Sequence, residues 1–173
     1  MAAEYALKDF TDSGIDGYVS VNLSPASLEF VETIDSLSAL ASDRVVIEIT
    51  EHAAIRDPRV LLALLADFRD AGGRLAIDDM GTGYSGLSHL VELSPDIVKL
   101  DRSLVAGIAH GNVRHSLARS LVAFCSDVGT SIIAEGVETE EDSELLHNIG
   151  IDFAQGYLYA RPGPLIESCA TAP

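Results

Sequence analysis

Several apolar segments of this chain end in polar side chains that bind cations or phosphates. The residues that share this position are Asn22, Glu48, Asp78, Asp79, Lys99 and Glu135. Carboxylates that crowd together without a counter-charge raise one another's pKa values, and bound divalent metal relieves that repulsion. Oxygen ligands without Cys or His favour hard ions such as Mg²⁺, Mn²⁺ or Ca²⁺ over Zn²⁺.

The adjacent pair Asp78-Asp79 suggests two metal ions, one carboxylate being shared and the other held by the second ion. Two ions about 3.5–4 Å apart activate a water and stabilise the attacking and leaving oxygens of a phosphoester. Lys99 is then available to orient that water or to neutralise the phosphate.

Some of these residues have simpler interpretations. Glu51, Asp101 and Glu138 also follow apolar segments, and each is about as well explained as a helix cap or a loop residue. Asn22 can be a turn residue, and Lys99 can extend from an edge strand into solvent. The five histidines have no ligand spacing and are expected at the surface or as caps: His52, His89, His110, His115 and His147.

Six short segments rich in Val and Ile are expected to be strands buried on both faces. They are Tyr18–Leu23, Val45–Thr50, Leu75–Asp79, Ile97–Asp101, Ser131–Glu135 and Phe153–Leu158. Helical spacing of apolar residues lies between them, over Ser27–Leu40, Pro58–Ala71, Val113–Val128 and Glu140–Asn148.

This alternation predicts a parallel α/β protein. Polar residues at the ends of many strands favour a (β/α)8 barrel, whose catalytic residues gather at one mouth. An open doubly wound sheet is less favoured, because the sequence has neither of the glycine-rich phosphate loops typical of such folds.

The composition limits the possible partners. The 173 residues include 11 Lys and Arg and 27 Asp and Glu, giving a net charge of −16, which argues against binding DNA or an anionic membrane. The length suits a single domain. Two cysteines and the lack of a membrane-length apolar run or a secretory signal indicate a soluble cytoplasmic protein.

Six segments together resemble the EAL-domain family of bacterial cyclic di-GMP phosphodiesterases, which have a modified (β/α)8 barrel. They are VNLSP (Val21–Pro25), VIEITE (Val46–Glu51), IDDMGTGYSGL (Ile77–Leu87), DIVKLDRSLV (Asp96–Val105), IIAEGVET (Ile132–Thr139) and QGYLYARP (Gln155–Pro162). The resemblance implies hydrolysis of cyclic di-GMP to linear pGpG with Mg²⁺ or Mn²⁺, and inhibition by Ca²⁺.

The resemblance also implies roles for individual residues. Asn22, Glu48 and Asp78 resemble ligands of the first metal, while Asp78 and Asp79 resemble ligands of the second. Lys99 resembles the lysine near the catalytic water, and Glu135 a base or second-metal ligand. Supporting or substrate-binding positions are matched by Thr50, Glu51, Asp101, Glu138 and Gln155, with Glu51 anchoring the loop Met80–Leu87 that contributes to dimerisation in the family.

The sequence departs from the family in one respect. The Glu-Ala-Leu motif, whose Glu is a metal ligand in the family, does not occur. We therefore expect residues 1–173 to form a single EAL-like domain that lacks its N-terminal segment, an incomplete barrel of about six βα units. Three functions stay open: a phosphodiesterase, a non-catalytic cyclic di-GMP-binding module, and an interaction module that dimerises through the Met80–Leu87 loop or the exposed barrel edges.

Overall fold

The structure is a computed structural model that describes residues 10, 17–24, 43–53, 55, 57–82 and 86–163. The side chains of residues 64 and 112 are not described. The predicted helix Ser27–Leu40 lies outside these residues. The chain divides into two compact units, which are described separately. Unit 1 comprises Met1–Ile49, Ala53–Leu75 and Pro162–Pro173, and unit 2 comprises Thr50–His52 and Ala76–Arg161.

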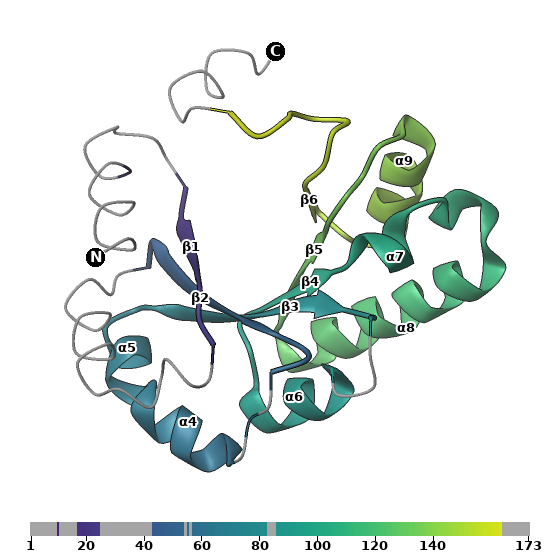
Figure 1. The fold of residues 1–173 in the computed structure, drawn as a ribbon. Helices are drawn as coiled ribbons and strands as arrows, with labels where there is room; N and C mark the ends of the chain where they lie inside the picture. The colour runs from purple at the N-terminus through teal and green to yellow at the C-terminus, as the bar shows by residue number, and fades with distance from the viewer. Residues whose placement is uncertain are drawn as a thin grey trace. The chain divides into compact units, whose positions relative to one another are not determined.

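The six predicted strands are all present (Figure 1). They are β1 (Val19–Asn22), β2 (Val45–Thr50), β3 (Arg74–Met80), β4 (Ile97–Leu100), β5 (Ser131–Ala134) and β6 (Phe153–Ala154). Their order in the sheet follows the order of the chain. The pairs β1–β2, β3–β4, β4–β5 and β5–β6 are parallel, as the alternation of strands and helices predicts.

In unit 1, the helices α4 (Pro58–Leu64) and α5 (Ala66–Asp70) occupy the predicted single helix Pro58–Ala71. Asp57 caps α4 by accepting a hydrogen bond from the Arg59 N–H at 2.9 Å. The helical path is interrupted at Leu65, although the N–H of Leu65 still bonds the Leu61 carbonyl at 3.0 Å. The prediction of one uninterrupted helix was therefore wrong at a single residue.

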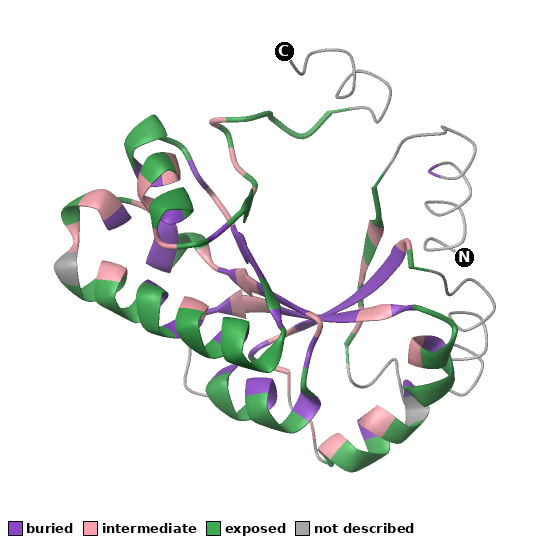
Figure 2. Ribbon diagram, turned by 180° about the vertical axis from the view of Figure 1, so that it is seen from behind, coloured by how far each residue is buried: buried purple, intermediate pink, exposed green. Residues whose placement is uncertain are grey.

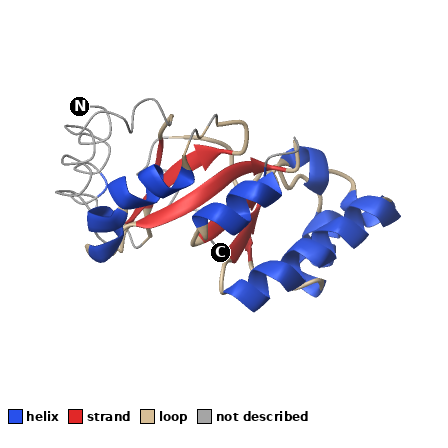
Figure 3. Cartoon of the chain, turned by 90° about the horizontal axis from the view of Figure 1, so that it is seen from below, coloured by secondary structure: helices blue, strands red, loops and turns tan. Residues whose placement is uncertain are grey.

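In unit 2, the helices connect successive strands (Figure 3). They are α6 (Gly86–Leu93), α7 (Arg102–Val105), the 3₁₀ turn η1 (Ile108–His110), α8 (Asn112–Val128) and α9 (Glu140–Asn148). The α8 and α9 helices were predicted within a residue of their observed bounds. The α6, α7 and η1 segments were not predicted.

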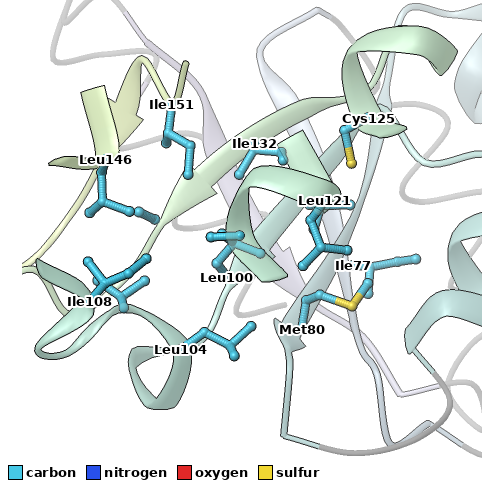
Figure 4. Packing of buried hydrophobic residues seen from close by; sticks show 14 of the residues in the cluster. Ile77, Met80, Leu100, Leu104, Ile108, Leu121, Cys125, Ile132, Leu146 and Ile151 are labelled. Carbon is cyan, nitrogen blue, oxygen red and sulfur yellow. The ribbon is translucent and has the colours of Figure 1, made fainter. Parts of the chain in front are cut away.

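The core of unit 2 joins one face of each long helix to the strands (Figure 4). Leu90 of α6, Leu121 of α8 and Leu146 of α9 pack in one cluster with Val98 of β4 and Ile132 of β5. Exposed residues cover the remaining faces of α8 and α9 (Figure 2). Apolar residues at helical spacing therefore fix which side of each helix meets the sheet.

Two sequence-based expectations are corrected in this unit. His89, expected at the surface, is buried on α6, because it lies on the same face as Leu90 and Leu93. The predicted strand Phe153–Leu158 is only the two-residue β6, and the chain then turns at Gly156. A Cβ atom at Gly156 would lie 2.2 Å from the Val137 carbonyl oxygen, so only glycine fits there.

A buried carboxylate links α9 to the turn before α8. Asp142 accepts hydrogen bonds from the N–H groups of Gly107 at 3.0 Å and Ala109 at 3.1 Å. The N–H of Asp142 donates to the Oγ1 of Thr139, the N-terminal cap of α9. Burial by itself would raise the pKa of Asp142, but these hydrogen bonds outweigh it and hold the pKa below the usual 3.8.

None of the helices in the described part of the chain combines the length and the apolar character that crossing a membrane requires.

Asp142→Asn tests this link. The variant lacks the negative charge that accepts hydrogen bonds from two backbone N–H groups. We therefore expect its free energy of unfolding at pH 7 to be lower by about 1–3 kcal/mol. Because the pKa of Asp142 is lowered in the folded state, the extra stability of the wild type over the variant is complete above about pH 4. This extra stability declines as the pH falls further. Urea unfolding at several pH values measures both effects. An equal loss in Glu144→Gln, an exposed acid of the same helix, would contradict the assignment.

Candidate metal centre

Three carboxylates of unit 2 converge at the ends of neighbouring strands. Asp78 and Asp79 come from β3, and Glu135 follows β5 directly. Each offers an oxygen atom, and the three atoms lie within 4.8 Å of one another. An all-carboxylate set of this spacing suits a hard divalent cation, as the residue types predict.

A shift in strand register explains how two consecutive residues reach the same place. On β3, Ile77 pairs with Val98 and Met80 pairs with Leu100, so that Asp78 and Asp79 together face the single residue Lys99 of β4. In a regular strand, neighbouring side chains point to opposite faces. The extra residue interrupts that alternation, and Asp79 adopts a positive φ of 60°. Aspartate tolerates this backbone conformation better than most residues.

Lys99 lies between two of the carboxylates. Its Nζ atom is 3.1 Å from Oδ1 of Asp78 and 2.7 Å from Oε1 of Glu135. The Nε2 atom of Gln155 donates to that same Glu135 oxygen at 2.6 Å. The three charged side chains are only 11–16% exposed, so these interactions are less screened than surface ion pairs. The arrangement fixes Glu135 from two sides.

The charges around Asp79 do not balance. Burial raises its pKa above the usual 3.8, and the neighbouring charges of Asp78 and Asp101 raise it further. Lys99 and His52 act in the opposite direction but only in part. Additional positive charge would therefore stabilise the ionised form of this cluster, which is the physical condition for binding a metal.

Unit 1 brings the other two predicted ligands together. Asn22, the last residue of β1, is the direct partner of Glu48 in the β1–β2 register, two residues before the end of β2. The next residue, Leu23, donates its N–H to the Glu48 carbonyl at 2.9 Å. The Glu48 side chain is buried, being 4% exposed.

Glu51 holds the segment after β3, as the resemblance implies. Its Oε2 atom accepts a hydrogen bond from the Gly81 N–H at 2.9 Å, and its N–H bonds the Asp78 carbonyl at 2.9 Å. Glu51 is 1% exposed, and its Oε1 atom has no partner among the described residues. Thr50, the last residue of β2, is half-buried.

Asp101 and Glu138 are used differently. Asp101 caps α7 by accepting the Ser103 N–H at 2.7 Å, which is the simpler of its two interpretations. Burial alone would raise its pKa, but the bonds from Ser103 and the charge of Arg102 lower it. Glu138 forms an ion pair with Arg102 at 2.9 Å. The sequence interpretation did not single out Arg102, although it directly follows the strand-end Asp101.

Comparison with known proteins assigns this chain to a family. The profile of the EAL domain matches residues 2–162, and the chain belongs to that family. It is 34% identical over 162 residues to the bifunctional diguanylate cyclase/cyclic di-GMP phosphodiesterase MucR of Pseudomonas aeruginosa. That alignment covers 90% of this chain and 24% of MucR, so the chain spans about a quarter of its relative.

Solved structures agree with this assignment. Klebsiella pneumoniae BlrP1, in a manganese/cyclic di-GMP complex, has a TM-score of 0.82 at 36% identity, over 92% of this chain and 42% of BlrP1. An EAL domain protein from Listeria monocytogenes has a TM-score of 0.85 at 29% identity, over 95% of this chain and 68% of that protein. The predicted α/β fold, six βα units of a TIM-like barrel, is confirmed.

Asp79→Asn tests the charge imbalance in the cluster. Because the folded pKa of Asp79 is raised, its ionisation opposes folding increasingly as the pH rises from about 4 towards neutrality. In EDTA at pH 7 we expect the variant to melt at a higher temperature than the wild type. In Mn²⁺ the order should reverse, because the wild type has the additional carboxylate ligand.

Melting curves recorded with and without Mn²⁺ measure both effects. Asp127→Asn, which removes one exposed acid of α8, is the matched control. It should melt like the wild type both in EDTA and in Mn²⁺. Equal Mn²⁺-induced shifts in the wild type and Asp79→Asn would count against a metal centre at this position.

Proposed function

We propose that the chain hydrolyses one phosphodiester bond of cyclic di-GMP, giving the linear dinucleotide pGpG, with Mg²⁺ or Mn²⁺. The observation that carries the proposal is the carboxylate cluster of Asp78, Asp79 and Glu135, with Lys99 bonded to two of its members. Membership of a family with phosphodiesterase relatives supports the choice of substrate. The proposal takes residues 1–173 as one EAL-like domain and places the reaction in the cytoplasm.

The donor set is suited to divalent ions. Asp78 and Asp79 are proposed as ligands, Asp78 being the shared one, and Glu135 as a ligand or a base. Asn22 and Glu48 are proposed as further ligands on the strength of the family resemblance. When bound, divalent ions lower the pKa of a coordinated water and neutralise charge on a phosphate.

Electrostatics makes metal necessary for this substrate. Cyclic di-GMP carries two negative phosphodiester groups, and the chain has a net charge of −16. Lys99 contributes one positive charge to the cluster, through its ion pairs with Asp78 and Glu135. A single ammonium does not outweigh three carboxylates, so the substrate would be repelled from the metal-free cluster.

The protein side chains then have separate roles. Lys99, freed from one of its carboxylate partners, is proposed to orient the attacking water and to offset charge on the phosphate. Gln155 is proposed to hold Glu135 in place through the Oε1 atom. Glu51 is proposed to hold the backbone after β3 through the Gly81 N–H. The proposed supporting or substrate-binding residues are Thr50, Asp101 and Glu138.

Turnover of cyclic di-GMP in Mn²⁺, followed by chromatography of the products, tests the proposal. We expect pGpG to accumulate, EDTA to abolish the reaction, and Lys99→Met to lower kcat by about a hundredfold or more. Arg59→Met, which removes an exposed cation on α4, is the control and should retain full turnover. Failure of the wild type to form pGpG in either Mn²⁺ or Mg²⁺ would overturn the assignment.

A second candidate function is non-catalytic binding of cyclic di-GMP. The observation that favours it is the similarity to BlrP1, which was solved in a manganese/cyclic di-GMP complex. Calorimetry with cyclic di-GMP and Ca²⁺, which is expected to inhibit turnover, separates the two. Heat of binding without any turnover in Mn²⁺ supports the binding module, and turnover excludes it.

We also propose that two copies pair through the region of the Met80–Leu87 loop. Leu87 and Val91, four residues apart on α6, are 59% and 67% exposed and form an apolar strip beside that loop. We expect sedimentation to give twice the chain mass and Val91→Glu to give the monomer mass. Val113→Glu, at a still more exposed position on α8, is the control. A monomeric wild type would contradict this pairing.

A further inference from the structure

The turn Glu135–Glu138 follows β5 and carries one member of the carboxylate cluster at its start. Glu135 continues the sheet, since its N–H bonds the Leu100 carbonyl at 3.0 Å. Gly136 then adopts a left-handed backbone conformation, with a φ of 68°. The position of the Glu135 carboxylate therefore depends on what holds the residues that come after it.

One side of this turn rests on the residues after β6. The Val137 N–H bonds the Gln155 carbonyl at 3.1 Å, and the Val137 carbonyl accepts the Leu158 N–H at 3.1 Å. Gly156 lies directly against the Val137 backbone, as described above. This side therefore has backbone hydrogen bonds and close packing.

The other side of the turn is covered by Arg102, the first residue of α7. A Cβ atom at Gly136 would lie 2.7 Å from both Cβ and Cγ of Arg102 and 3.0 Å from its Cδ. The aliphatic part of Arg102 therefore lies directly on the Gly136 backbone. Its Nη2 atom reaches on to Oε1 of Glu138 at 2.9 Å. Arg102 thus contacts the turn at two points.

We propose that Arg102 is a positioning residue that holds the Glu135 carboxylate in the metal cluster by clamping the turn Glu135–Glu138 against the residues after β6. The inference rests on the proposed function for its effect on turnover, and on geometry alone for its effect on the turn. Arg102 contacts the backbone of Gly136 and the carboxylate of Glu138, so its effect on Glu135 passes through the backbone.

The two contacts of Arg102 differ in weight. Arg102 and Glu138 are 60% and 42% exposed, and an ion pair so accessible to water contributes little. The aliphatic stem packs on the Gly136 backbone and leaves no room for a side chain there. The stem should therefore position the turn more than the charge does.

A series of substitutions at this residue separates stem from charge. Arg102→Ala removes both, Arg102→Met keeps most of the stem, and Arg102→Lys keeps stem and charge. We expect Arg102→Ala to lower kcat and Mn²⁺ affinity by about tenfold or more, with KM for cyclic di-GMP unchanged. Arg102→Met should lose much less, and Arg102→Lys should restore values close to the wild type.

Two further readouts do not require turnover. Mn²⁺ affinity follows from electron paramagnetic resonance of the free ion in the absence of substrate. Amide hydrogen exchange at Val137 should quicken in Arg102→Ala, because that N–H bonds Gln155 only while the turn stays in place. Arg119→Ala removes an exposed arginine of α8 and serves as the matched control for every measurement.

Gly136→Ala provides an independent test. The added methyl group must displace Arg102, so the substitution should weaken Mn²⁺ binding as Arg102→Ala does. In the double variant the two losses should be less than multiplicative, since both act on one contact. Fully multiplicative losses would show that they act separately.

The outcomes distinguish this inference from the proposed function. If the wild type turns over cyclic di-GMP but Arg102→Ala matches Arg119→Ala in kcat, Mn²⁺ affinity and Val137 exchange, the clamp is wrong and the function stands. If the wild type has no turnover, the proposed phosphodiesterase activity is wrong. The positioning role of Arg102 is then tested by comparing Mn²⁺ affinity and Val137 amide exchange between Arg102→Ala and Arg119→Ala. A failure of Arg102→Lys to restore Mn²⁺ affinity would also overturn it.

Discussion

The main constraint on unit 2 is the repulsion among carboxylates that the fold holds within 4.8 Å of one another. Lys99 compensates part of this charge by bonding Asp78 and Glu135, and the raised pKa of Asp79 shows what is left uncompensated. Folding thus creates a local deficit of positive charge that a divalent ion can fill. Strand order, the β3 irregularity and the turn after β5 all serve to maintain it.

Backbone geometry, more than side-chain packing, delivers these groups. The register shift on β3 lets consecutive residues share one face, at the expense of a positive φ at Asp79. The turn that begins with Glu135 is fixed by close approach of the Gly156 backbone to the Val137 backbone and by packing of the Arg102 side chain on the Gly136 backbone. A substitution at either glycine would therefore move a carboxylate without altering any ligand.

The sequence predicted the parts of the molecule that follow from regular patterns. Short apolar segments identified all six strands, and apolar periodicity identified α8 and α9. Parallel strands place their carboxyl ends along one edge, so the meeting of Asp78 with Glu135 was predictable as well. Short helices escaped prediction because four residues, as in α7, cannot display a helical period.

Other features depend on three-dimensional contacts that no local pattern encodes. The role of Asp101 as a cap, rather than as a member of the cluster, is decided by the direction of the chain into α7. The burial of His89 follows from the packing of α6. Leu65 lies where α4 ends and α5 begins, which apolar spacing along the sequence does not reveal. The fit of Arg102 on Gly136 joins segments more than thirty residues apart.

The bond between Asp142 and the Gly107–Ala109 turn has a consequence for unfolding. It ties α9 to the start of α8 across 33 and 35 residues of sequence, with the whole of α8 and β5 lying between. A segment closed at both ends in this way cannot open piecemeal without first exposing a buried charge. The region from η1 to α9 should therefore behave as one cooperative foldon, which opens all together or stays closed.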